Sequence, residues 1–166
     1  MQNRNDPFWC VLPGEDSTIE QAAALALKRD GKDWRVLLVT SRQDGRWILP
    51  KGWIEAGEDA AESAAREAYE EAGVKGALGE EPLGSYRYSK KLSGDDSVRS
   101  RVTVFPLLVR KVLSDWPEIG QRKRRWMSLE AACKKVGDRG LADLLKQLCG
   151  PDAKSLRKTV EALDED

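Results

Sequence analysis

The sequence has no histidine among its 166 residues, and its only cysteines are Cys10, Cys133 and Cys149. Without histidine, the chain cannot build a serine-histidine-aspartate triad, a histidine-ligated zinc site or a histidine general base. The cysteines are widely separated and form no C-x-x-C motif, which argues against a structural zinc site or a disulfide framework and favours buried free thiols. Any acid–base or metal chemistry must therefore rest on carboxylates.

Long apolar runs and a charge imbalance are also missing. No segment approaches the roughly 18 apolar residues that a membrane-spanning helix needs, so we expect no membrane partner. The stretch from Met1 to Pro7 lacks the apolar core of a signal peptide, which predicts a cytoplasmic protein. The 28 basic residues equal the 28 acidic ones, which argues against a stable nucleic-acid partner. The sequence leaves the oligomeric state open.

The hydrophobic pattern predicts one domain of mixed α and β structure. Strand-like runs occur over residues 19–29, 34–40, 46–49, 83–91, 98–112 and 124–127. Helical spacing occurs over residues 59–72, 129–136, 141–148 and 152–163. We divide the chain into an N-terminal arm over residues 1–17, a main domain over residues 18–150 and a C-terminal helical extension or tail over residues 151–166.

The helix expected over residues 59–72 carries small residues on one stripe. Alanine recurs at steps of three and four, at Ala61, Ala64, Ala65, Ala68 and Ala72. Such a stripe lets a helix backbone lie close against a sheet. Asp59 and Glu62 have the spacing of a capping box, and Gly73 is expected to end the helix.

Three glutamates lie roughly opposite the alanines. Glu67, Glu70 and Glu71 stand at i, i+3 and i+4 and span about 100° of arc. Like charges at this spacing repel one another, and a divalent cation bound between them would reverse the sign of that interaction. Oxygen ligands without histidine or cysteine favour Mg²⁺ or Mn²⁺ over zinc or copper. For Glu70 and Glu71 taken alone, an ordinary solvated helix face is the alternative.

The residues around these glutamates complete a longer pattern. They follow the frame G-x5-E-x7-R-E-U-x-E-E-x-G-U, where U is aliphatic, and fill it with Gly52, Glu58, Arg66, Glu67, Ala68, Glu70, Glu71, Gly73 and Val74. Ala68 stands where a larger aliphatic residue is usual. Over this motif the chain resembles the Nudix hydrolase family, and the strand-like runs on both sides extend the likeness over residues 18–150.

The resemblance implies a Nudix-type α/β/α sandwich with a mixed central sheet. It also implies divalent-metal hydrolysis of a diphosphate linked to another moiety, with Mg²⁺ as the cofactor and Mn²⁺ as an alternative. The implied metal ligands are Glu67, Glu70, Glu71 and the backbone carbonyl of Gly52. Glu58 would pair with Arg66, whose guanidinium can anchor one carboxylate and leave the others for the metal. An ordinary helix ion pair with Glu62 or Glu70 is the alternative for Arg66.

The chemistry of a phosphoanhydride explains why such a site needs these groups. The bond is protected by its own negative oxygens, so a catalyst must neutralise them and supply a water molecule in line. Because histidine is absent, the proton acceptor must be a carboxylate. We expect Glu70 or Glu71 in this role, with Glu118 or Asp95 as loop-borne alternatives.

Segments outside the motif resemble the diadenosine polyphosphate and diphosphoinositol polyphosphate phosphohydrolases of this family. They include Arg46-Trp47-Ile48, Leu78-Gly79 and Arg122-Lys123-Arg124 with Trp126. These enzymes handle very acidic small molecules, and we predict substrate contacts for Arg42, Lys51, Trp53, Arg124 and Arg125. The entry Pro50-Lys51-Gly52 looks more like the diadenosine branch, since the inositide branch usually has glycines after the proline.

Other functions stay open. Within the family they are an RNA 5′-pyrophosphohydrolase and an ADP-ribose-type pyrophosphatase. A nucleotide-sensing Nudix domain without catalysis is disfavoured, because the glutamates and the arginine of the motif are intact. A nucleic-acid binder that uses Arg122 to Arg125 is disfavoured by the net charge of zero.

Overall fold

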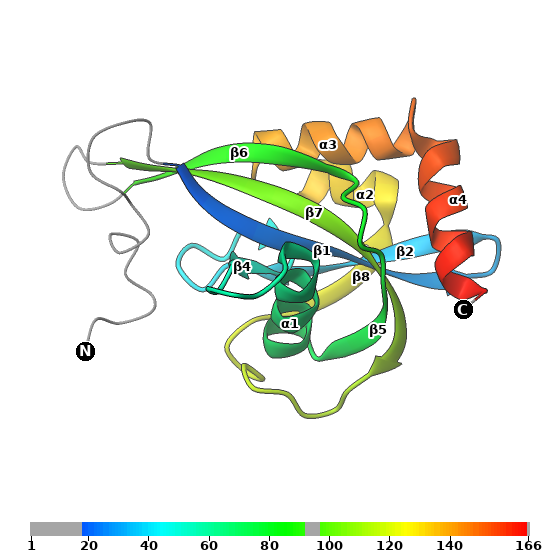
Figure 1. The fold of residues 1–166 in the computed structure, drawn as a ribbon, viewed down its shortest axis with the longest axis horizontal. Coiled ribbons are helices and arrows are strands. Elements are labelled where there is room, and N and C mark those ends of the chain that lie inside the picture. The colour runs from blue at the N-terminus through cyan, green and yellow to red at the C-terminus, as the bar shows by residue number, and fades with distance from the viewer. Residues whose placement is uncertain (1–17, 92–96, 166) are drawn as a thin grey trace.

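A mixed β-sheet forms the centre of the protein (Figure 1). The computed structural model describes residues 18–91 and 97–165. The strands are β1 (Thr18–Asp30), β2 (Asp33–Thr40), β3 (Trp47–Ile48), β4 (Lys51–Trp53), β5 (Val74–Leu78), β6 (Gly84–Lys91), β7 (Ser97–Val112) and β8 (Arg124–Ser128). They follow the order β3-β2-β1-β7-β5, while β4 pairs with β1, β6 with β7 and β8 with β2. Only the β1–β7 pair is parallel among the described strands.

Helices cover both faces of this sheet. On one face lies α1 (Ala60–Ala72), and on the other lie α2 (Leu129–Lys135), α3 (Arg139–Cys149) and α4 (Ala153–Asp164). Figure 1 shows α1 on the opposite side of the sheet from the three later helices. Each face has its own cluster of buried apolar side chains. The predicted α/β/α sandwich with a mixed sheet is therefore confirmed.

Small side chains bring α1 close to the sheet. Ala22, Ala24 and Ala26 of β1 lie in the same buried cluster as four alanines of the helix, Ala61, Ala64, Ala68 and Ala72. These helix alanines are at most 1% exposed, whereas Ala65 of the predicted stripe is only partly buried and Ser63 is fully buried. Because nothing larger than a methyl group separates these backbones at the contact, side chains beside the stripe are carried into the interior.

Two short strands were not among the predicted elements. The predicted strand over residues 46–49 ends before Pro50, but residues 51–53 form a further strand, β4, which pairs with β1. Residues 74–78 form β5, which pairs with β7 through an irregularity between Lys75 and Gly76. Both strands are too short to show a period of two, so only their partners define them.

The capping box predicted at the start of α1 is absent, whereas the predicted end of the helix is confirmed. Asp59 is the N-cap residue, but its side chain makes no capping hydrogen bond, so the predicted capping box does not form. Gly73 ends the helix as predicted, in the left-handed conformation with φ 65°. There its N–H donates to the carbonyls of Ala68 and Tyr69.

The C-terminal residues belong to the packed structure. Helical spacing was expected over residues 152–163, and α4 (Ala153–Asp164) lies there and buries Leu156 and Val160 in the same cluster as α3. Cys133 is buried and Cys149 partly so, and their sulfur atoms lie 3.6 Å apart as free thiols. The arm over residues 1–17, with Cys10, and Asp95 lie outside the described residues. None of the described helices has the length and apolar character needed to cross a membrane.

We predict that Gly73→Ala destabilises the protein by about 3 kcal/mol, because two costs add. The left-handed backbone costs an alanine about 1–2 kcal/mol, and a Cβ atom at this position would approach the Trp116 ring to 2.6 Å. Gly45→Ala is the matched control, since Gly45 has φ 69° but open space around its Cβ position. Urea unfolding should therefore show a clearly larger loss for Gly73→Ala; equal losses would contradict the steric contribution of Trp116.

Candidate active site

Strand β4 meets the motif helix where Gly52 faces Glu67. Gly52 pairs with Ala22 of β1, whose side chain lies on the sheet face that α1 covers. A Cβ atom at Gly52 would overlap the Glu67 carboxylate. The missing side chain therefore lets this carboxylate enter between the helix and the sheet, beside the Gly52 backbone.

Two motif carboxylates are buried, so the prediction that the glutamates lie opposite the buried alanines of α1 is wrong for Glu67 and Glu71. Glu67 and Glu71 are 8% and 5% exposed, whereas the side chain of Glu70 is 37% exposed. Burial raises the pKa of Glu67, against the opposing charge of Arg66. Burial also raises the pKa of Glu71 well above its ordinary value, although the charge of Arg122 acts in the opposite direction. A solvated helix face is therefore excluded for Glu71, and the buried carboxyls favour a bound positive charge.

Arg66 connects three parts of the motif. Its Nε lies 3.1 Å from Glu58 Oε2, so the expected Glu58–Arg66 pair is present, and its Nη2 donates to the Trp53 carbonyl at 3.2 Å. Its Nη1 lies 2.8 Å from Glu67 and 3.4 Å from Glu70. Burial alone would lower the Arg66 pKa, but the hydrogen bonds to Glu58 and the charge of Glu67 raise it overall. The guanidinium thus ties the β4 loop to the helix face.

Arg122 is a partner of Glu71, although it was not among the predicted site residues. Its side chain is 9% exposed, and its Nη2 lies 3.2 Å from Glu71 Oε1. Its Nε reaches Glu118 at 3.4 Å, and its Nη1 donates to the Thr40 carbonyl at 3.1 Å. Arg122 belongs to the basic run of residues 122–125 but precedes β8, and no sequence pattern distinguishes it from its basic neighbours.

The structure gives Arg124 a different role from the predicted substrate contact. Its guanidinium donates to the carbonyls of Ala72 at 2.7 Å and Leu113 at 3.0 Å, and it stacks on the Trp116 ring at 4.0 Å. It therefore fastens the C-terminal end of α1 to the loop after β7. Arg125 is exposed on β8, where it pairs with Leu38 of β2.

A groove of about 450 Å³ contains Glu71 in its lining. Four basic side chains share that lining, those of Arg42, Arg46, Lys51 and Arg122. Arg42 and Lys51 therefore lie where the sequence predicted substrate contacts, whereas Trp53, Arg124 and Arg125 are not among the described residues that line the groove. Lys51 also belongs to the site through its backbone, since its N–H donates to Glu71 at 3.3 Å.

The donor set fits a hard divalent cation. Its ligating groups are carboxylate oxygens and the backbone at Gly52, which are the ligand types that Mg²⁺ and Mn²⁺ prefer. Within residues 18–91 and 97–165, no three acidic or cysteine side chains already converge as a metal site. Salt bridges to Arg66 and Arg122 engage Glu67, Glu70 and Glu71 instead. The assignment of these glutamates as ligands remains a prediction.

A carboxylate-bearing helix on an α/β/α sandwich, beside a groove lined by four basic side chains, has the groups that hydrolysis of a phosphoanhydride needs. A family model described as the NUDIX domain matches residues 19–148. The chain belongs to the Nudix family, as its motif predicted.

Curated relatives support the enzyme class. The chain is 36% identical over 140 residues to diphosphoinositol polyphosphate phosphohydrolase 2 of Rattus norvegicus, covering 80% of this chain and 73% of the relative. It is 39% identical over 118 residues to diphosphoinositol polyphosphate phosphohydrolase 3-alpha of Mus musculus, covering 69% and 67%. Both names describe phosphohydrolases, so the predicted pyrophosphohydrolase class is confirmed.

Solved structures show the same fold. One is an Ap4A hydrolase of C. elegans in a binary complex, with a TM-score of 0.62, 20% identity, and coverage of 82% of this chain and 99% of that one. Another is a MutT protein from Methanosarcina mazei Go1, with a TM-score of 0.62, 23% identity, and coverage of 83% and 97%. At these identities the likeness supports the fold alone.

We predict that Glu71→Gln stabilises the metal-free protein at neutral pH. The pKa of Glu71 is raised in the folded state, so its ionised form destabilises the fold above that pKa, and this penalty disappears as the pH falls. The wild-type melting temperature in EDTA should therefore rise between pH 7.5 and pH 5.5, and Glu71→Gln should reduce that rise. Glu70→Gln is the control, because its more exposed side chain should change the profile less. A lower melting temperature for Glu71→Gln at pH 7.5 would contradict the prediction.

Proposed function

We propose that this protein hydrolyses the phosphoanhydride of a small polyphosphorylated molecule, either a diphosphoinositol polyphosphate or a dinucleoside polyphosphate. The observation that carries the proposal is the groove in which Arg42, Arg46, Lys51 and Arg122 share one lining with buried Glu71. Basic groups there can bind the phosphates while the carboxylates act on the anhydride beside them. The lining also contains Asp44 and Asp138, so its four basic side chains exceed its three acidic ones by one. In a chain of zero net charge, this local excess, which includes the two basic residues that contact Glu71, Lys51 and Arg122, is what would attract the anion.

The motif residues would act together in this reaction. When bound by Glu67, Glu70, Glu71 and the Gly52 carbonyl, Mg²⁺ or Mn²⁺ supplies charge neutralisation and acidifies water. Arg66 holds Glu58, Glu67 and Glu70 in place on the helix face. Glu71 is the candidate proton acceptor, because its carboxyl is buried and lines the groove.

Both substrate classes have support. The relatives that are 36% and 39% identical are named for diphosphoinositol polyphosphates. The dinucleoside class is supported by Lys51, which follows Pro50 and presents its side chain to the groove. We also propose that the protein is located in the cytoplasm.

The test is a hydrolysis panel with Mg²⁺, with Mn²⁺ and with EDTA. It should contain a diphosphoinositol polyphosphate, diadenosine polyphosphates, ADP-ribose, nucleoside triphosphates and triphosphorylated RNA. We expect turnover of at least one of the first two classes, lost in EDTA and restored by Mg²⁺, with Glu70→Gln and Glu71→Gln each lowering kcat by about 10²-fold or more. Retention of near-normal turnover by both variants would refute the site assignment. Preferred turnover of RNA or ADP-ribose would reassign the substrate.

We predict that Arg42→Ala raises the KM for the accepted substrate about tenfold, because one charge-assisted contact to a phosphate is lost. Arg42 lines the groove, whereas Arg125 is exposed outside it. Arg125→Ala is therefore the matched control and should leave KM within about twofold of the wild type. Steady-state kinetics at constant ionic strength measures both values. Equal increases in KM would mean that net charge, and not the groove, determines affinity.

A further inference from the structure

A chain of hydrogen bonds runs from the groove into the sheet. Lys51 Nζ lies 2.9 Å from the Tyr88 hydroxyl, which lies 2.7 Å from Gln21 Oε1. The ammonium also lies 4.5 Å from the centroid of the Tyr88 ring. Gln21 is only 7% exposed, so the inner end of the chain is buried. Lys51 and Tyr88 both line the groove.

The direction of these hydrogen bonds follows from the chemistry of the groups. An ammonium group can only donate, and the side-chain carbonyl oxygen of Gln21 can only accept. The phenol hydrogen of Tyr88 must therefore point to Gln21, which leaves a phenol lone pair for Lys51. One ammonium hydrogen is used in this way, and two remain for an anion in the groove.

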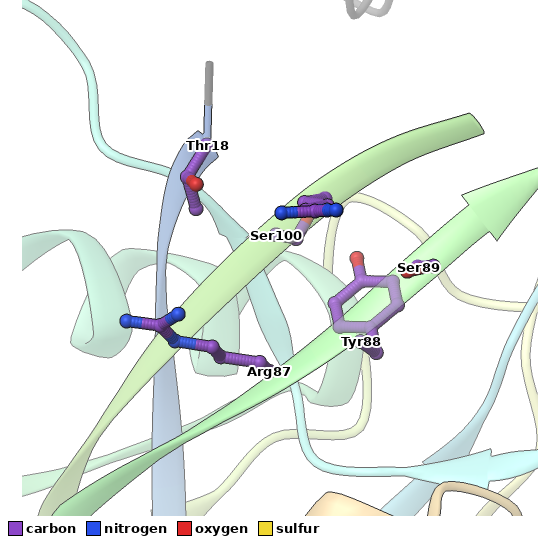
Figure 2. A pocket seen from close by; sticks show the side chains of 6 residues that line it. Thr18, Arg87, Tyr88, Ser89 and Ser100 are labelled. Atoms are coloured by element: carbon purple, nitrogen blue, oxygen red, sulfur yellow. The ribbon is translucent and has the colours of Figure 1, made fainter. Parts of the chain in front are cut away.

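Strand pairing places these side chains on one face of the sheet. Gln21 and Lys51 lie on adjacent strands, opposite Trp53 and Ala23 respectively. Tyr88 lies opposite Ser100 across the β6–β7 pair. Figure 2 shows Tyr88 and its neighbour Arg87 leaving β6 in different directions, as expected for successive residues of a strand. The contact between β4 and β6 side chains thus depends on β1 and β7 between them.

We propose that Tyr88, oriented by Gln21, is a positioning residue that holds the Lys51 ammonium toward the phosphates of the bound substrate. This proposal rests on the proposed function of the groove. A lysine side chain has four flexible methylene groups, and fixing it during binding costs conformational entropy. The phenol and its ring fix the ammonium before the substrate arrives, so this cost does not weaken binding. Tyr88 therefore acts on affinity through Lys51.

The first test is Tyr88→Phe, which removes the hydroxyl and keeps the ring. We expect KM to rise about three- to tenfold with kcat within about twofold of the wild type. Tyr69→Phe is the matched control, because Lys75 Nζ also lies over the Tyr69 ring, at 4.6 Å, and neither residue is among those lining the groove. A fall in kcat with unchanged KM, or an equal effect of Tyr69→Phe, would overturn the proposal.

The second test is a double-mutant cycle on the binding of inorganic tripolyphosphate, followed by calorimetry. Tyr88→Phe should weaken binding about three- to tenfold in the wild type, but have little further effect beside Lys51→Met. Gln21→Leu should act in the same direction as Tyr88→Phe. Equal effects of Tyr88→Phe in both backgrounds, or no tripolyphosphate binding by the wild type, would overturn the proposal.

These tests separate the two proposals. If the wild type binds tripolyphosphate with the expected coupling but hydrolyses nothing in the substrate panel, the proposed function fails and the positioning role of Tyr88 stands. If hydrolysis is present and the coupling between Tyr88 and Lys51 is absent, the positioning role fails alone.

Discussion

The site depends on keeping two carboxylates away from water between a helix and a sheet. Glu67 and Glu71 are nearly fully buried, and ionised groups in such a position are costly unless positive charge or hydrogen bonds compensate them. Arg66 of α1 provides positive charge beside Glu67, and Arg122, which precedes β8, provides it beside Glu71. Burial nevertheless raises the pKa of both carboxyls, so part of this cost is left uncompensated, and further positive charge at this position would be favourable.

This burial is a consequence of small side chains. Alanines on β1 and α1 remove the bulk that usually separates a helix from a sheet, and Gly52 removes the last obstacle beside Glu67. The tight contact therefore has two effects, since it excludes water from the carboxylates and brings the backbone of β4 to them. A larger residue at Gly52 would affect packing and the site together, because they occupy the same space.

Charge in this protein is arranged locally. The chain as a whole is neutral, yet basic side chains converge on one groove because the loop between β2 and β3, strand β4 and the segment before β8 meet there. Several of these groups already have partners, such as Arg46 with Asp44 at 2.7 Å and Lys51 with Tyr88. The two contacts differ in kind, because the Asp44 carboxylate offsets the charge of Arg46, whereas the neutral phenol of Tyr88 leaves the charge of Lys51 in place.

The sequence by itself determined the elements whose information is local. Helical spacing and Gly73 defined α1 and its end, because residues three and four apart meet on one helix face. The resemblance to the Nudix motif implied the contact of Glu58 with Arg66. The tertiary structure alone decided β4, β5 and the different fates of Arg122 and Arg124. Arg122 forms a salt bridge with Glu71, and Arg124 donates a hydrogen bond to the carbonyl of Ala72 at the end of α1. Arg122 and Arg124 are two positions apart in one basic run, and their roles differ because different segments of the chain fold against each of them. No local sequence pattern encodes which distant segment contacts which arginine.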